Sequence, residues 1–192
     1  DTGEYLYTVT GKWNDRDGAY RGYLLCIRTG MEPRFYVSTD GVDFPAAVST
    51  ETLVTGQWYH LAGTFDGTEI KIFVDGEETG TATIGSSPLN TNDQPLLIGA
   101  DRAGGGKGNF LDGQIDEVRV WDVVRSEADI LANHNTKLNG NETGLIGYWN
   151  FNEGSGDIAH DSSGYGNDGN LINMDAGTCW VDGISGTGLK FD

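Results

Sequence analysis

Basic residues are scarce in this chain. Its 192 residues include 12 lysines and arginines against 29 aspartates and glutamates, which gives a formal net charge of −17. Nucleic acids carry phosphates of the same sign, so the composition disfavours a nucleic-acid partner. An excess of acidic residues suits a solvated surface, a divalent-cation binder or a protein that works where salt screens its charge.

Long hydrophobic runs are also missing. No stretch of eighteen apolar residues occurs, and therefore we expect no membrane insertion. The hydrophobic fraction is only 37%, which suits strands that turn one face to water. Proline is rare, with 4 residues, whereas glycine is abundant, with 30. That combination favours many short strands joined by tight turns.

Cysteine is limited to Cys26 and Cys179, and no Cys-x-x-Cys pair is present. A zinc site or a thioredoxin-like redox motif is therefore unsupported. A disulfide between the two cysteines would close a long loop and would add about 4–5 kcal/mol of stability in the entropy model. Alternatively, Cys26 is a small buried hydrophobic residue in a strand that runs from Tyr23 to Arg28. The sequence leaves both alternatives open.

Two alternating runs at 58–65 and 69–74 are the strongest pattern in the chain. The second places Ile70, Ile72 and Val74 on one side and polar or mixed residues on the other, with the period of two that a strand requires. Asp-Gly pairs follow each run and are typical of tight turns. The pattern predicts a β-meander that is half buried on one face.

Further strands and one helix are expected along the chain. Residues 110–121 alternate as one strand. Ser126 and Asp129 resemble a capping box, which predicts a short helix over 126–135. About a dozen short strands with a single helix predict an all-β, antiparallel sandwich.

Three motifs resemble the LamG-like (laminin G type 3) domains of the concanavalin A-like lectin/glucanase superfamily. Residues 56–76 are similar to the central hairpin of that family, residues 113–121 to its last core strand, and residues 144–169 to its opening. The resemblance implies a jelly-roll β-sandwich. The motifs occur in permuted or repeat-shifted order, because the closing motif precedes the opening one.

This order predicts a division of the chain. Residues 1–136 would be the C-terminal part of a LamG-like sandwich, 137–142 a linker, and 143–192 the N-terminal part of a LamG-like unit, either by permuted closure or as the next repeat. The family would also place two more strands between residues 189–192 and the strand at 4–13. We therefore expect either self-association through open sheet edges or a sandwich that closes with fewer strands.

Catalytic groups are not evident. Related glucanases use paired carboxylates that point to the same side of one strand. Asp116 and Glu117 are adjacent, and in a strand they would point to opposite faces. No other catalytic motif appears, so the sequence predicts a protein that is not an enzyme.

A calcium site is predicted in the oxygen-rich loop 161–169, because hard cations prefer six to eight oxygen ligands. By resemblance, this loop meets an acidic residue of the last core strand. The predicted ligands are Asp116, Asp161, Gly164, Asn167 and Asp168. The alternative is a loop of Asx-turns that needs no metal.

Sugars stack on exposed aromatic rings, which makes the aromatic residues beside loops the candidate ligand-binding residues. These are Trp13, Tyr20, Tyr165 and Trp180. Packing in the core is the alternative for each of them.

With the resemblance to LamG-like domains, these features imply a non-catalytic, calcium-stabilised recognition or adhesion module that is secreted or displayed at the cell surface. Its partner would be a glycan or an extracellular protein. The alternative is a structural subunit of an extracellular fibre or matrix, assembled by strand complementation between chains.

Overall fold

The computed structural model describes residues 5–14, 20–102 and 108–191. The chain divides into two compact units. Unit one takes the described residues up to Leu111 together with Ser126–His134, and unit two takes Asp112–Arg125 and the described residues from Asn135 onward. The predicted division placed 112–125 with the N-terminal part, whereas in the structure this segment belongs with the C-terminal one.

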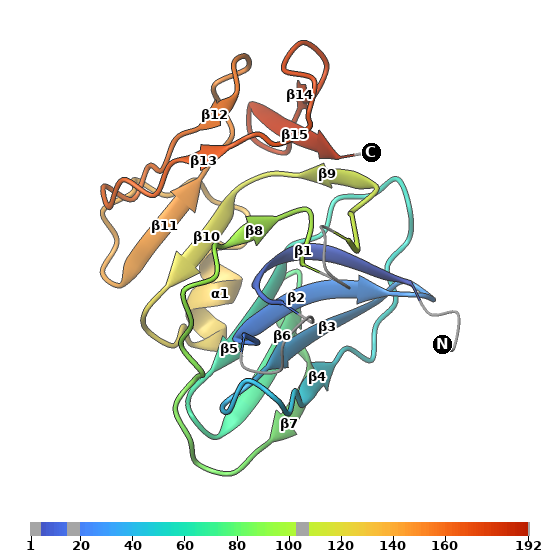
Figure 1. Cartoon of the computed structure of the whole chain (residues 1–192), viewed down its shortest axis with the longest axis vertical. Helices are drawn as coiled ribbons and strands as arrows, with labels where there is room; N and C mark the ends of the chain where they lie inside the picture. The colour runs from blue at the N-terminus through green and yellow to red at the C-terminus, as the bar shows by residue number, and fades with distance from the viewer. Residues whose placement is uncertain (1–4, 15–19, 103–107, 192) are drawn as a thin grey trace. The chain divides into compact units, whose positions relative to one another are not determined.

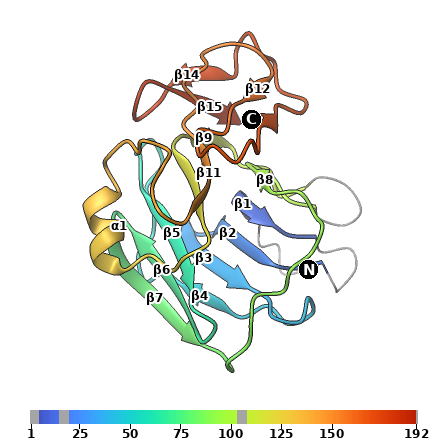
Figure 2. The same cartoon turned by 90° about the vertical axis from the view of Figure 1, so that its left-hand side faces the viewer.

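Unit one contains two antiparallel sheets, whose strand orders are β4-β3-β2-β1-β8 and β5-β6-β7. Figures 1 and 2 show the two sheets as layers, with α1 on the outside of the three-stranded one. The elements are β1 Leu6–Lys12, β2 Tyr23–Arg28, β3 Glu32–Val37, β4 Ala46–Val48, β5 Leu61–Phe65, β6 Glu69–Val74, β7 Glu77–Thr83, β8 Leu97–Ile98 and α1 Glu127–Asn133. The predicted all-β antiparallel fold with one short helix is therefore confirmed for the described residues.

The main core of unit one lies between these sheets. Strands β2 and β3 alternate, so that every second side chain points inward. The inward side chains pack with those of β6 in one buried cluster of Leu25, Phe35, Val37, Ala47, Ile70 and Ile72. Phe73, on the other side of β6, is buried as well. The prediction that this meander buries only one face was therefore incomplete.

Helix α1 begins where its cap was predicted. The Ser126 hydroxyl accepts a hydrogen bond from the Asp129 backbone amide at 3.2 Å and donates to the Asp129 carboxylate at 2.7 Å. The first of these bonds satisfies one of the amides that the first helical turn leaves without a partner. The helix packs near the turn before β7, where Gly76 has φ +91° and a Cβ would lie only 2.8 Å from Leu131 Cδ1. A glycine is therefore required at this position.

Unit two consists of three small antiparallel sheets with the orders β10-β11, β12-β13 and β14-β15-β9. Its strands are β9 Gly113–Ile115, β10 Val118–Trp121, β11 Leu145–Trp149, β12 Ile158–Ala159, β13 Gly169–Asn170, β14 Trp180–Asp182 and β15 Thr187–Phe191. The continuous strand predicted over 110–121 is wrong. It is interrupted at Asp116 and Glu117, because Glu117 adopts a left-handed backbone conformation with φ 57°.

Several strands that were expected to lack neighbours are paired within the chain. The C-terminal strand β15 pairs with β9, and β11 pairs with β10. In unit one, β1 pairs with β2 on one side and with β8 on the other. Each of these strands therefore has at least one partner in its own chain, although β10 and β11 form a sheet of two strands in which each has a single neighbour. Self-association and closure with fewer strands both stay predictions.

Two further sequence expectations concern the cysteines and the membrane. Cys26 and Cys179 are both buried free thiols in the structure. The description of Cys26 as a small buried residue fits its position in β2, where no part of it is exposed. Within the described residues, we find no helix with the length and apolar character needed to cross a membrane.

Candidate functional site

The five-stranded sheet of unit one has a second face, turned away from the main core, which we call the distal face. It carries the side chains that alternate with the core residues of β2 and β3. Register places Leu24 beside Tyr36, Cys26 beside Arg34, and Arg28 beside Glu32. The face thus changes from aromatic at one end to charged at the other.

Four side chains form a cluster at the aromatic end. Trp13 and Phe44 make an edge contact with ring centroids 5.8 Å apart, and Tyr36 lies 6.1 Å from Trp13 and 6.2 Å from Phe44. The guanidinium carbon of Arg21 lies 4.5 Å from the Phe44 centroid, a cation–π contact. Trp13 is only 4% exposed, whereas Phe44 remains 46% exposed. The Phe44 ring is therefore exposed to solvent while it packs against buried aromatic side chains.

The loop that carries Phe44 is held by one carboxylate. Asp40 Oδ1 accepts hydrogen bonds from the backbone amides of Val42 at 2.8 Å and Asp43 at 2.9 Å. These bonds lower the pKa of Asp40 below its usual value. Arg21, which lies outside the loop, also stabilises it, because its guanidinium donates a hydrogen bond to the Val42 carbonyl at 2.8 Å. These hydrogen bonds hold the backbone that directly precedes Phe44.

A neighbouring polar loop fixes the backbone on the other side of the cluster. The side-chain amide of Asn90 donates to the Arg21 carbonyl at 2.8 Å, and that of Asn92 donates to the Tyr20 carbonyl at 3.3 Å. A Cβ at Gly22 would come within 3.1 Å of the Lys12 carbonyl oxygen and 3.3 Å of the Asn90 oxygen. Glycine at this position therefore allows the two loops to approach closely.

A row of polar groups continues from the cluster along β3. The Arg34 guanidinium pairs with Glu32 at 2.5 Å and donates to the Tyr36 hydroxyl at 3.2 Å. Burial alone would lower the pKa of Arg34, but the hydrogen bonds to Tyr36 and Glu32 outweigh it and raise that pKa. The Glu32 and Arg34 side chains are 31% and 27% exposed. The row therefore presents donors and acceptors side by side at the surface.

Buried polar groups lie near Cys26, which Thr8 of β1 faces in the strand register. Asp101 is buried, and its carboxylate accepts hydrogen bonds from the Thr8 hydroxyl at 3.2 Å and from the Asn109 side chain at 2.9 and 3.1 Å. Burial is the main cause that raises the pKa of Cys26 to about 12. The thiol therefore stays protonated and unreactive near neutral pH.

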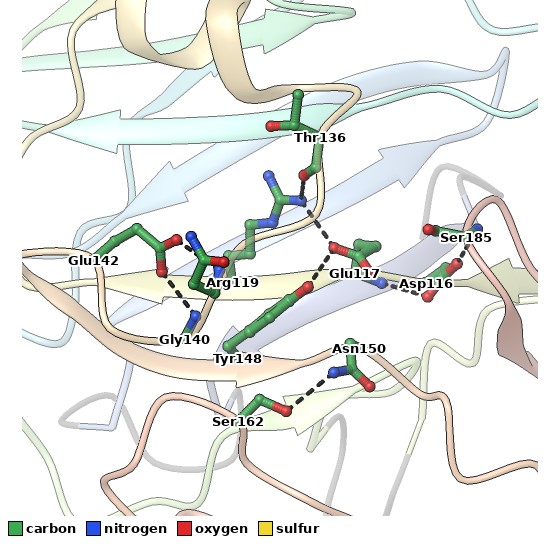
Figure 3. A network of polar contacts seen from close by, with 11 residues as sticks. Asp116, Glu117, Arg119, Thr136, Gly140, Glu142, Tyr148, Asn150, Ser162 and Ser185 are labelled. Atoms are coloured by element: carbon green, nitrogen blue, oxygen red, sulfur yellow. Dashed lines mark hydrogen bonds and ion pairs between the residues drawn. The ribbon is translucent and has the colours of Figure 1, made fainter.

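Unit two contains a separate polar network around Glu117 (Figure 3). Glu117 Oε2 accepts hydrogen bonds from Arg119 at 2.9 Å and from the Tyr148 hydroxyl at 2.8 Å. Arg119 also donates to the Thr136 carbonyl at 2.5 Å. The Glu117 and Arg119 side chains are each only 11% exposed. Burial, followed by the bond to Glu117, raises the pKa of Tyr148.

Asp116 lies next to this network but has different partners. Its carboxylate accepts hydrogen bonds from the backbone amides of Glu117 at 2.7 Å and Ser185 at 3.0 Å. Burial is the largest influence and raises the pKa of Asp116. The opposite-face argument assumed a regular strand, which the structure does not have here. The two carboxylates are nevertheless held by different groups, as Figure 3 shows.

The oxygen-rich loop is organised by Asp161. Its carboxylate accepts hydrogen bonds from the backbone amides of Ser163 at 2.8 Å, Asn167 at 2.9 Å and Tyr148 at 3.0 Å. Although burial opposes the shift, these bonds and one from the Ser163 hydroxyl lower the pKa of Asp161. Asp168 accepts from the Asp161 amide at 2.8 Å. This is the pattern of an Asx-turn loop held by its own carboxylates.

The residues of the predicted calcium site fit a metal poorly in this arrangement. The Asp161 oxygens already accept hydrogen bonds from backbone amides, and the Asp116 carboxylate accepts from the amides of Glu117 and Ser185, which lie outside this loop. Among residues 5–14, 20–102 and 108–191, no three or more His, Cys, Asp and Glu side chains are grouped as a metal site would need. Calcium also binds carbonyl oxygens, which Gly164 and Asn167 would supply and which are not among those side chains. Calcium binding therefore stays a prediction.

The four predicted ligand-binding aromatics lie in different surroundings. Trp13 is part of the distal-face cluster, and Tyr20 directly precedes Arg21. In unit two, Tyr165 is 67% exposed, and Trp180 is partly buried, with its indole nitrogen donating to the Gly156 carbonyl at 2.9 Å.

Sequence reasoning missed Phe44, which the structure makes the exposed member of the cluster. A signal was available in Pro45, because the residue before a proline is confined to extended conformations. An aromatic residue held extended in a loop is a candidate contact residue.

Two antiparallel sheets packed face to face make unit one a β-sandwich. The family model of the concanavalin A-like lectin/glucanases superfamily, Laminin_G_3, matches residues 4–131, which is more than half of the chain. The chain therefore belongs to this family.

Curated relatives and a solved structure are also similar. Mouse pappalysin-1 is 28% identical over 130 residues and human pappalysin-1 is 28% identical over 128, which is 61% and 60% of this chain. The chain spans only 8% of the length of either relative. A crystal structure from Bacteroides ovatus ATCC 8483, of a protein proposed to bind carbohydrate, matches with a TM-score of 0.63 and 23% identity. That match covers 88% of this chain and 53% of the other, and it shows the fold alone.

Proposed function

We propose that this protein is a non-catalytic glycan-binding module of LamG-like type, and that the ligand lies on the distal face of unit one. The observation that carries the proposal is Phe44, which stays 46% exposed although Trp13 and Arg21 contact its ring. Exposed rings on a rigid support bind the apolar faces of sugars.

Polar groups toward the charged end of the same face add to such a site. Glu32 accepts hydrogen bonds, Arg34 donates them, and both are partly exposed on the same face of the sheet. Sugar hydroxyls both donate and accept, so a paired acid and base can bind two of them together. The name of the Bacteroides ovatus protein, which shares the fold, is consistent with this ligand class.

Absence of catalysis is part of the proposal. Glycoside hydrolysis of this kind needs two carboxyl groups that flank the same glycosidic bond of the substrate. Glu117 is engaged by Arg119 and Tyr148, and Asp116 by two backbone amides. These contacts support a structural role for both. A reducing-sugar assay on β-glucan or galactan tests this, and turnover that disappears in Glu117→Gln would contradict it.

We also propose that the module works outside the cell, secreted or at the cell surface, where glycans and adhesion partners are displayed. Binding to a protein ligand is a second outcome of the binding test. Assembly into fibres lacks a specific supporting observation, because β1, β11 and β15 pair within the chain.

A glycan array tests the site directly. Wild-type protein should give reproducible glycan signals that Phe44→Ala removes. Phe110→Ala is the matched control, since Phe110 is also an exposed phenylalanine of unit one, at 55% exposure. Signals that survive Phe44→Ala but disappear in Tyr165→Ala would move the site to unit two and contradict the proposal.

A further inference from the structure

We infer that the free edge of β5 binds an extended, cationic strand of another protein. Strand β5, Leu61–Phe65, lies at one end of the sheet β5-β6-β7, whereas the distal face belongs to the other sheet of unit one. The inference therefore goes beyond the proposed glycan site and does not depend on it. It is carried by the backbone groups that β5 turns away from β6, by the residues of the strand and by the charges beside it.

The hydrogen bonds at the two ends of the β5-β6 ladder fix its pattern. The Asp75 amide donates to the His60 carbonyl at 2.8 Å, and the Asp66 amide donates to the Glu69 carbonyl at 3.3 Å. His60 and Asp66 thus stand in hydrogen-bonded pairs, and the register between them has no shift. Because hydrogen-bonded and non-hydrogen-bonded pairs alternate along an antiparallel ladder, every second residue from His60 bonds to β6.

This alternation leaves a row of backbone groups on the outer side of β5. Ala62 and Thr64 bond to β6, whereas Leu61, Gly63 and Phe65 point their amides and carbonyls away from it. Within the residues that the structure describes, no hydrogen bond reaches these outer amides and carbonyls. The three residues are only partly buried. They therefore present donors and acceptors in the regular order that a further strand needs.

The composition of β5 leaves this edge unprotected. Natural proteins prevent strand addition with charged residues, proline, bulges or very short edge strands. Of the other edge strands of unit one, β7 carries Glu77 and Glu78, β4 has three residues and β8 has two. Strand β5 has five residues, none of which is charged or proline, and its register is regular. It is therefore a template for an extended chain.

The two sides of β5 define the side chains of the added strand. Leu61 and Phe65 pack against the main core, and a Cβ at Gly63 between them would collide with the Phe35 ring. On that side, apolar side chains of an added strand would continue the core. The other side carries only the small Ala62 and Thr64, which leave room for polar groups. The partner is therefore a segment in which apolar and polar residues alternate.

The charges beside β5 are mainly negative. Lys71 is the one lysine or arginine of β5, β6 and β7, and its amino group lies 2.9 Å from Glu78 and 3.9 Å from Glu69, with Glu127 of α1 also acting on it. Asp66, directly after β5, is exposed, and hydrogen bonds from two backbone amides lower its pKa. This excess of carboxylates attracts a cationic segment.

The same charges disfavour a second copy of the chain as the occupant of the edge. Each copy has a net charge of −17, so two copies repel each other. Pairing of β5 with β5 would also place the carboxylates beside this strand on both sides of the new contact. A partner of opposite charge is therefore favoured.

Amide hydrogen exchange in the free chain, measured residue by residue by NMR, gives the first test. We expect the amides of Leu61, Gly63 and Phe65 to exchange at least about tenfold faster than those of Ala62 and Thr64, because only the latter are hydrogen-bonded. Slow exchange at all five would show that the edge is already covered and would overturn the inference. Outer amides that exchange more slowly as protein concentration rises would identify a second copy as the occupant and also overturn it.

The second test adds a short peptide in which valine and threonine alternate, with a lysine at each end. We expect saturable shifts and slower exchange at Leu61, Gly63 and Phe65. The same peptide with glutamates in place of the lysines should bind at least about tenfold more weakly at low salt, and NaCl should reduce the difference. A version with N-methylated backbone amides should not bind, because it cannot donate hydrogen bonds to the β5 carbonyls.

Thr64→Lys places a charge on the edge strand, and Thr81→Lys is the matched control, because Thr64 and Thr81 lie opposite Lys71 on its two sides. A thermal melt checks that both variants fold. We expect Thr64→Lys to weaken binding of the lysine peptide at least about tenfold and Thr81→Lys less than about threefold. Similar losses in both variants, or no saturable shift at the three outer amides, would overturn the inference and leave the proposed glycan site standing.

Discussion

Arg21 lies over the ring of Phe44, with its guanidinium carbon 4.5 Å from the ring centroid, and it donates a hydrogen bond to the carbonyl of Val42 at 2.8 Å. One side chain thus holds both the exposed ring and the backbone of the loop that carries it. This contact joins two segments that are about twenty residues apart in the sequence.

The first prediction concerns this contact. Arg21→Met keeps most of the apolar stem but removes the charge and the donor. We expect glycan affinity to fall about tenfold, because a loosened Phe44 must be ordered again on binding. Calorimetry on the strongest array hit measures the change. Unchanged affinity in Arg21→Met would show that the ring is positioned without the arginine.

Acid should release the Phe44 loop. The pKa of Asp40 is lowered in the folded protein, so its stabilising bonds are fully present above the unfolded value, 3.8, and are lost as pH falls through the folded value. We expect the amide NMR signals of Val42 and Asp43 to shift together with a midpoint below 3.8. In Asp40→Asn this transition should be absent. A midpoint above 4 would contradict the assigned hydrogen bonds.

The Glu117 network should matter for stability. Glu117 and Arg119 are nearly buried, and removing one partner of such a pair leaves an uncompensated charge at a cost of about 3–5 kcal/mol. We therefore expect Glu117→Ala to lower the free energy of unfolding by that amount. The double variant Glu117→Leu with Arg119→Met should recover most of the loss. Urea denaturation measures the free energy of unfolding of both variants. An unchanged free energy of unfolding in Glu117→Ala would refute the structural role.

Much of the fold was readable from the sequence, for identifiable reasons. The Ser126 cap acts on the Asp129 amide three residues away, and the alternation that marks β6 as a strand is local, so both elements were predicted correctly, although burial of Phe73 on the other side of β6 was not. The break at Glu117 was not, since a left-handed φ at a glutamate has no signature in the residue pattern. Phe44 was missed because its partners, Trp13 and Tyr36, are brought to it only by the tertiary fold.

The oxygen-rich loop gives a prediction about calcium. Asp161→Ala leaves three backbone amides without their acceptor, and we expect a loss of about 1–3 kcal/mol in the free energy of unfolding with or without metal. Bound calcium would appear in elemental analysis and as a melting temperature that falls on chelation. If elemental analysis finds no metal and the melting temperature does not change on chelation, the calcium prediction is wrong and the loop is held by the hydrogen bonds of Asp161 and Asp168 alone.

Assembly is the fifth prediction. Because β1 and β15 have partners in the same chain, we expect a monomer by light scattering and unfolding whose midpoint does not depend on protein concentration. Larger particles that dissociate on dilution would instead support strand complementation between chains.

The central claim is that a glycan binds at the Phe44 end of the distal face. The most direct test is a two-dimensional NMR titration of the chain with the glycan that gives the strongest signal on the array. We predict saturable shifts at the amides of Arg21, Arg34, Tyr36 and Phe44, with little change around Tyr165 and Trp180. Saturable shifts confined to the surroundings of Tyr165 and Trp180, with the distal face unchanged, would contradict the account.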